Sequence, residues 1–115
     1  MKKILFYAMN GERACFIHVL LNALKLHEAG HEVKIIFEGM SVKLPPVLAK
    51  DDDPRHQQYQ QALDNGIIAG VCRVCSNVMG VLEENEKLGL ELLADMEGHA
   101  GIKDYVENGY EIIFS

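Results

Sequence analysis

The sequence predicts one α/β domain, a three-layer α/β/α sandwich built around a mainly parallel sheet of five strands. Three observations lead to this prediction. Short apolar runs alternate with segments of helical spacing in the order strand, helix, strand, through to a fifth strand. The chain has 115 residues, which suits a single domain spanning 1–115. It contains no internal repeat and no linker.

The first three expected elements form a strand, helix, strand unit. Ile4–Met9 is continuously apolar, which is typical of a strand buried on both faces. Apolar residues then recur at helical spacing from Cys15 to Leu24, and Gly30 suits the left-handed end of that helix. His31–Phe37 is the second expected strand. A helix crossing between two strands makes the strands parallel.

The rest of the chain continues the alternation. Segment 38–53 has no clear period, and the acidic run at 51–53 is interpreted as an exposed helix start. Segment 83–87 is interpreted as a solvated turn. The remaining expected elements are a helix at 54–65, a strand at 66–71, a helix at 72–79, a strand at 90–96, a helix at 101–107 and a strand at 110–114.

Charge and composition exclude some partners. The net charge is −6 and the 11 Lys and Arg residues are scattered, which argues against a nucleic-acid partner. No apolar stretch is long enough to cross a bilayer, and no leader cleavage site follows the first strand, so we expect a cytoplasmic protein and no membrane partner. Three cysteines in a reducing compartment suggest reactive, metal-binding or buried thiols.

The pair Cys72 and Cys75 is the strongest candidate for chemistry. Cys72 lies where the third strand meets a helix, and free backbone N–H groups at a helix start favour a thiolate. Arg73 would favour it further, and Gly70 would leave space for an approaching partner. Cys75 lies one turn on, where it either resolves an oxidised Cys72 or packs under the helix. The alternative for Cys72 is a small buried packing residue.

Other candidate residues lie in the loops that follow the strands. The carboxyl ends of parallel strands form the usual ligand site of such a sheet. These loops would bring Asn10, Glu12, Arg13, Glu38 and His99 toward Cys72 as cleft residues. On its own, His99 is interpreted as a solvated loop histidine.

Cofactor and metal sites are not predicted. The segment Asn10–Arg13 could bind an anion, but it lacks the glycines of a dinucleotide loop and the hydroxyls of a flavin loop. A structural zinc site usually has two ligand pairs at short spacing, and this chain has one. Cys15 is expected in the core. A thioredoxin-like dithiol is disfavoured because the pair follows the third strand and no later proline exists.

Several segments together resemble the DsrE/DsrF-like family of small sulfur-relay proteins. They are the strand exit Asn10-Gly11-Glu12, the stretch Ala29–Val33, and the stretch Phe37–Leu44. Cys72 followed eight residues later by Gly80 is similar to the family's cysteine-to-glycine spacing. Met79 departs from the pattern, because the family often has Arg before that glycine.

The resemblance implies a flavodoxin-like fold and assembly into homodimers, trimers or hexamers. It also implies that Cys72 carries a persulfide passed between sulfur donor and acceptor proteins. We therefore expect a cytoplasmic sulfur carrier, with a non-catalytic ligand- or partner-binding protein as the alternative. A dithiol oxidoreductase using Cys72 and Cys75 is the third hypothesis.

Overall fold

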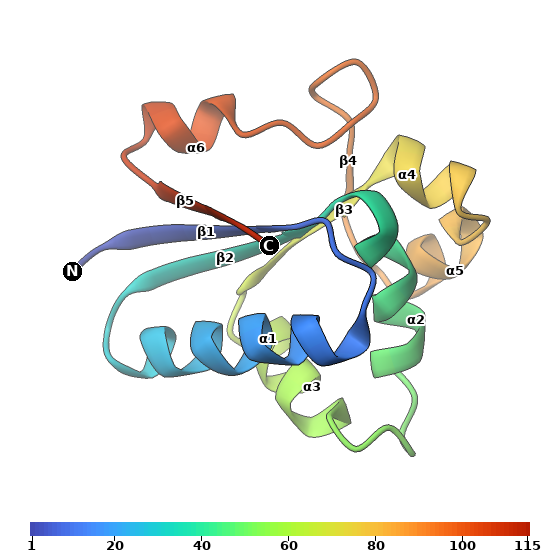
Figure 1. Ribbon diagram of the computed structural model, residues 1–115, viewed down its shortest axis with the longest axis horizontal. Helices are drawn as coiled ribbons and strands as arrows, with labels where there is room; N and C mark the ends of the chain where they lie inside the picture. Colours follow the sequence, from blue (N-terminus) through green and yellow to red (C-terminus); the bar gives the residue numbers. More distant parts are fainter.

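The computed structural model describes residues 1–115 and contains a five-stranded sheet in the order β4-β3-β2-β1-β5 (Figure 1). Its strands are β1 (Lys3–Ala8), β2 (Glu32–Phe37), β3 (Ile68–Cys72), β4 (Leu92–Leu93) and β5 (Glu111–Phe114). Every neighbouring pair is parallel. The predicted parallel α/β sandwich of flavodoxin-like type is therefore confirmed.

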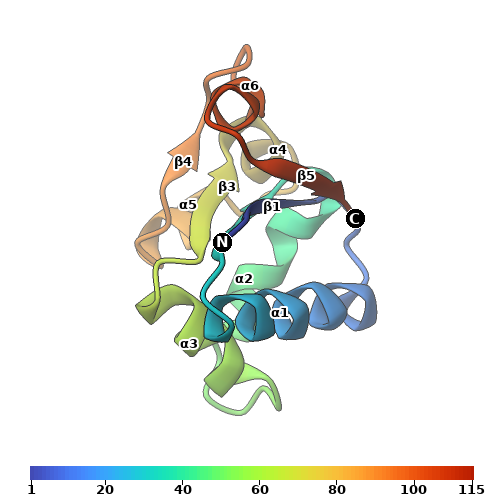
Figure 2. The same ribbon diagram turned by 90° about the vertical axis from the view of Figure 1, so that its left-hand side faces the viewer.

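Helices cover both faces of this sheet. They are α1 (Arg13–Glu28), α2 (Leu44–Leu48), α3 (His56–Asp64), α4 (Arg73–Val78), α5 (Leu82–Lys87) and α6 (Lys103–Glu107), with a 3₁₀ turn η1 (Gly39–Lys43). Figures 1 and 2 show α1, α2 and α3 below the sheet and α6 above it. None of these helices combines the length and apolar character needed to cross a lipid bilayer.

The strand order explains the path of the loop that follows β4. From β1 to β4 each strand is added on the same side of the previous one, whereas β5 returns to the far side of β1. Because parallel connections are right-handed, a crossover in the reverse direction passes over the other face. The segment 94–102 therefore begins a return path that brings it near the carboxyl ends of β1 and β2.

The core corrects the prediction for Cys15. Phe16, Leu20 and Ala23 of α1 are buried, and the Phe16 ring lies 4.9 Å from that of Phe37 in β2. Cys15 precedes this stripe by one residue, which is about 100° around a helix, and its thiol is exposed.

Two helices replace segments expected to be irregular. Segment 38–53 contains η1 and α2. Pro45 and Pro46 do not prevent α2 from forming, because they lie in its first turn, where proline is tolerated. The expected turn at 83–87 is the helix α5, with acidic residues in its first turn and Lys87 in its last. Asn85 of α5 is fully buried and donates to the Val42 carbonyl at 3.0 Å and to Ser76 Oγ at 3.1 Å.

Other boundaries differ from the predictions by a few residues, except at β4. Only Leu92 and Leu93 pair with β3, whereas a strand at 90–96 was expected. Gly70 explains the close approach of β4: a Cβ there would lie 2.4 Å from the Glu91 carbonyl oxygen. The space beside Gly70 is thus filled by β4, and the expectation that it admits a partner is wrong.

We predict that Gly70→Ala lowers the free energy of unfolding by about 1 to 3 kcal/mol, as overpacking does. The added methyl pushes Glu91 away and breaks the 2.9 Å bond from the Val71 N–H to the Glu91 carbonyl. Denaturant unfolding and hydrogen exchange at the Val71 amide measure both effects. Gly80→Ala is the control, because Gly80 also has a positive φ but a Cβ added there would meet no atom within 4 Å. Equal losses in both variants would contradict the packing argument.

Candidate thiol site

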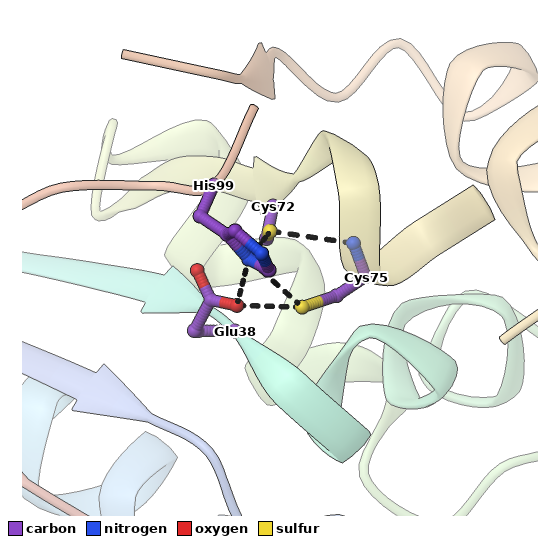
Figure 3. Close-up of side chains that lie close together, drawn as sticks. All are labelled: Glu38, Cys72, Cys75 and His99. Atoms are coloured by element: carbon purple, nitrogen blue, oxygen red, sulfur yellow. Dashed lines mark hydrogen bonds and ion pairs between the residues drawn. The ribbon is translucent and has the colours of Figure 1, made fainter. Parts of the chain in front are cut away.

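Four side chains from separate segments converge at the carboxyl end of the sheet (Figure 3). Glu38 follows β2, Cys72 ends β3, Cys75 lies in α4, and His99 lies in the loop between β4 and α6. One sulfur, nitrogen or oxygen atom of each residue lies within 4.8 Å of those of the others. Glu38, Cys72 and Cys75 are buried, and His99 is partly exposed. The fold thus builds one compact polar cluster here.

Cys72 is the residue at which β3 ends and α4 begins. Its Sγ accepts a hydrogen bond from the Cys75 backbone N–H at 3.4 Å, as the capping group of α4. The His99 Nδ1 atom also lies 3.4 Å from this sulfur. The side chain is fully buried. The Cys72 sulfur therefore has one backbone N–H donor and one imidazole nitrogen as its polar neighbours.

Cys75 has a different environment, although it lies only one turn further on. Its thiol donates to Glu38 Oε1 at 2.6 Å, and the sulfur lies 3.6 Å from His99 Nδ1. Burial and this hydrogen bond to Glu38 raise the pKa of the Cys75 thiol to about 12. Cys75 is therefore held as a protonated thiol at neutral pH.

Glu38 is a buried carboxylate with several hydrogen-bond donors. Its Oε1 accepts from the Gly39 N–H at 3.1 Å, and its Oε2 accepts from the Ala100 N–H at 3.1 Å and the Tyr7 hydroxyl at 3.2 Å. Burial acts to raise the pKa of this carboxyl, but hydrogen bonds from Cys75 and the other donors outweigh it and lower the pKa. Glu38 therefore stays ionised and fixes the loop that carries His99.

His99 is positioned by a tight turn in that loop. Met96 and His99 exchange two backbone hydrogen bonds, at 2.9 Å each, around Glu97 and Gly98, which both have positive φ. A Cβ at Gly98 would lie 2.4 Å from Val74 Cγ2, so glycine also permits the turn to rest on α4. The His99 side chain is 41% exposed and contacts both sulfurs and Glu38. The prediction of a merely solvated loop histidine is therefore wrong.

The remaining predicted residues do not join this cluster. Arg73 is exposed, and no hydrogen bond or ion pair links it to Cys72. Asn10 and Glu12 are exposed at the exit of β1, where the Asn10 side chain accepts from the Glu12 N–H at 2.7 Å. These residues form the local turn that leads into α1.

Arg13 is engaged elsewhere by an ion pair. Its Nη2 atom lies 2.6 Å from Asp53 Oδ1, and the Asp53 side chain is 8% exposed. The hydrogen bond from Arg13 holds the pKa of Asp53 below its usual value. The sequence suggested that the whole acidic run at 51–53 is exposed to solvent, and this is wrong for Asp53. Its ion pair with Arg13 links the start of α1 to the segment before α3.

Tyr7 was not identified from the sequence as part of the site. Its hydroxyl proton is shared between the Ala100 carbonyl oxygen, at 2.7 Å, and Glu38 Oε2, at 3.2 Å. The only signal was a single polar atom near the end of an otherwise apolar strand, since a buried hydroxyl usually has a partner. Tyr7 thus ties β1 to the loop that carries His99.

The four-residue cluster is not part of a large cavity. A cavity of about 560 Å³ lies between β4 and α6, next to Asp95 and Gly101 of the same loop, but none of the four clustered residues lines it. The cluster therefore has no large cavity that would enclose a substrate, and a reactant would approach the two sulfurs from the exposed side of His99.

Fold and site together define a small parallel α/β protein with a buried dithiol cluster. The chain belongs to the family of the archaeal protein named Uncharacterized protein MJ0733 from Methanocaldococcus jannaschii. The two are 37% identical over 97 residues, which cover 84% of this chain and 77% of the relative. An uncharacterized protein from Archaeoglobus fulgidus is 34% identical over 44 residues, or 38% of this chain and 72% of the relative. No family model and no solved structure matches the chain.

We predict that Tyr7→Phe lowers the free energy of unfolding by about 1 to 3 kcal/mol, because it leaves the buried Ala100 carbonyl without its donor. Chemical denaturation measures the loss. Tyr59→Phe is the matched control, since the buried Tyr59 hydroxyl has no hydrogen-bond partner and its removal is not expected to lower stability. If Tyr7→Phe were as stable as the control, the hydrogen bond from Tyr7 to Ala100 would contribute nothing to the free energy of unfolding.

We also predict that Cys75 alkylates in a pH range far above that of an ordinary thiol. Cys15, which is exposed, reacts first and is removed by Cys15→Ser. In that background, tandem mass spectrometry after timed alkylation gives the pH profile of Cys75, whose thiolate forms only toward about pH 12. Glu38→Gln removes the carboxylate acceptor and shifts the profile to lower pH, whereas Glu12→Gln at an exposed position leaves it unchanged. A profile that Glu38→Gln does not move would contradict this assignment.

Proposed function

We propose that this protein is a cytoplasmic sulfur carrier, in line with its resemblance to DsrE/DsrF-like proteins, and that Cys72 holds the transferred sulfur as a persulfide. The observation that carries the proposal is the asymmetry between the two thiols. Cys72 Sγ accepts a backbone N–H and faces an imidazole, whereas Cys75 donates its own proton to Glu38. The two sulfurs thus have different hydrogen-bond partners, and Cys75 is the one that is kept protonated.

Loading requires only a donor persulfide. The Cys72 thiolate attacks the outer sulfur of R–S–SH, the S–S bond of the donor breaks, and RS⁻ leaves, so Cys72 becomes Cys–S–SH. The Cys75 N–H and His99 Nδ1 lie 3.4 Å from Cys72 Sγ, the inner sulfur of that persulfide. An acceptor thiolate then attacks the same outer sulfur and releases the Cys72 thiolate.

Cys75 offers a second, slower route of release. Its sulfur attacks Cys72 Sγ, a Cys72–Cys75 disulfide forms, and sulfide leaves, while Glu38 takes the thiol proton. The hydrogen bond of 2.6 Å to Glu38 keeps that proton on Cys75 in the resting protein. This keeps the persulfide available to a partner, as a carrier needs, and argues against a dithiol oxidoreductase.

Donor and acceptor proteins would approach on the side of His99. His99 is the exposed member of the cluster, and Cys72 lies buried beneath the surface. A reducing cytoplasm keeps both thiols free of disulfide between transfers. We further propose that the protein assembles with copies of itself, as the resemblance implies.

A second candidate is a non-catalytic protein that binds a ligand or partner. The complete burial of Cys72 favours it, because buried cysteine is often a packing residue. In that case the cluster stabilises the loop between β4 and α6, and no reagent reaches Cys72 in the native state.

The test is the intact mass of the reduced protein after incubation with a low-molecular-mass persulfide. In a Cys15→Ser background we expect a gain of one sulfur atom per chain, which is lost in Cys72→Ser and retained in Cys75→Ser. We also expect Cys75→Ser to hold the sulfur longer than the parent, because the slow release to sulfide needs Cys75.

Three outcomes would overturn the proposal. Equal loading of Cys72→Ser would remove Cys72 as the carrier. No loading of the parent, together with no native alkylation of Cys72, would favour the non-catalytic candidate. A reversible Cys72–Cys75 disulfide without any persulfide would instead support the oxidoreductase.

A further inference from the structure

We propose that Glu38, Cys72, Cys75 and His99 bind one divalent, thiophilic transition-metal ion of the Zn²⁺ type, and that the bound ion blocks sulfur loading. The metal site follows from the donor atoms and their geometry, whereas the block on sulfur loading rests on the proposed sulfur-carrier function. The sequence alone predicts no metal site, because the four ligands come from residues 38, 72, 75 and 99 and not from two short-spaced pairs.

The donor set is of the right chemical kind. Two thiols, one imidazole and one carboxylate are the ligands that tetrahedral zinc sites use. All four donor atoms lie within 4.8 Å of one another. Thiolates select Zn²⁺ and similar ions over Mg²⁺ and Ca²⁺, which prefer sites made only of oxygen.

Three of the six distances between donor atoms fit a tetrahedron. Metal bonds of about 2.3 Å to sulfur and about 2.0 to 2.1 Å to nitrogen or oxygen imply edges of about 3.5 Å for sulfur–nitrogen and about 3.3 Å for nitrogen–oxygen. The two sulfur–nitrogen distances to His99 are 3.4 and 3.6 Å, and the nitrogen–oxygen distance to Glu38 is 3.3 Å. These three edges already have the required length.

One edge must lengthen when the ion enters. Cys75 Sγ lies 2.6 Å from Glu38 Oε1, to which its thiol proton is donated. When the metal replaces that proton, this edge opens to about 3.5 Å, the tetrahedral sulfur–oxygen distance. Binding releases the protons of both thiols to solvent, and the site then holds two thiolates, a carboxylate and a neutral imidazole.

The surroundings support an ion at this place. Glu38 is a buried carboxylate with no Lys or Arg partner, and its one ion-pair neighbour is His99. A divalent cation supplies the positive charge that this anion otherwise lacks. Tyr7 and the Ala100 N–H hold Oε2, which leaves Oε1 directed at the sulfurs, as outer-shell groups orient metal ligands.

Metal and sulfur cannot occupy Cys72 together. A coordinated Cys72 thiolate shares one of its three lone pairs with the metal, which lowers its nucleophilicity, so its attack on a persulfide is slowed. The ion therefore acts as a reversible block on loading, and its removal frees the carrier.

Co²⁺ is the probe for the site, because tetrahedral thiolate ligation gives it intense visible bands and a sulfur-to-metal charge-transfer band. We titrate reduced, metal-free Cys15→Ser protein with Co²⁺ and then displace it with Zn²⁺. We expect one Co²⁺ per chain with a tetrahedral spectrum. Cys72→Ser, Cys75→Ser and His99→Ala each weaken binding by at least about 100-fold, which is at or above the loss expected for an outer-shell change.

The controls separate a lost site from a lost fold. Because the His99 side chain is partly exposed, we expect His99→Ala to keep the circular dichroism and cooperative unfolding of the parent. It therefore still tests the site if a cysteine variant fails to fold. His27→Ala, at an exposed histidine of α1, is expected to bind Co²⁺ as the parent does. An octahedral spectrum, no binding, or unchanged binding in folded His99→Ala would overturn the metal site.

The two proposals fail in different ways. If the metal-free protein gains no sulfur but Co²⁺ binds as described, the sulfur carrier is wrong, its metal block falls with it, and the metal site stands. If the metal-free protein gains sulfur and Co²⁺ does not bind, only the metal site is wrong. If Zn²⁺-loaded protein gains sulfur at the rate of the metal-free protein, the blocking role is wrong.

Discussion

The buried carboxylate of Glu38 is the interaction on which the arrangement of the site depends. It stands at the end of β2, begins η1, and accepts hydrogen bonds from β1, from α4 and from the loop after β4. A buried ionised group needs such donors, because its desolvation is otherwise costly. Each donor is therefore held close to Glu38, and four separate segments are fixed together at one edge of the sheet.

The same carboxylate makes the two cysteines unequal. Cys75 donates to it and has a raised pKa, whereas Cys72 Sγ accepts from a backbone N–H and contacts His99. The hydrogen bond to Glu38 is thus one cause of the raised pKa of Cys75. The proposed persulfide chemistry would use the difference between them, and the proposed metal site would use what they share, namely two sulfur atoms directed at one volume.

The sheet and the position of Cys72 could be predicted, because they depend on local pattern. Continuous apolar runs mark buried parallel strands, and the loops after such strands share one edge. Cys72, Cys75, Glu38 and His99 were therefore all named as candidates. The short helices α2 and α5 were missed, because a proline pair and an acidic run also suit a loop, and tertiary packing decided between the two.

The sequence by itself determined the parallel α/β sheet and the placement of a Cys-x-x-Cys pair at the end of its third strand. Only the tertiary structure decided that Arg73 faces solvent, that Tyr7 and Glu38 hold the loop after β4, and that His99 reaches both sulfurs. The physical reason is that strand order and the direction of the last crossover set which loops meet. Contacts between residues 61 positions apart, such as Glu38 and His99, leave no periodic trace in the chain.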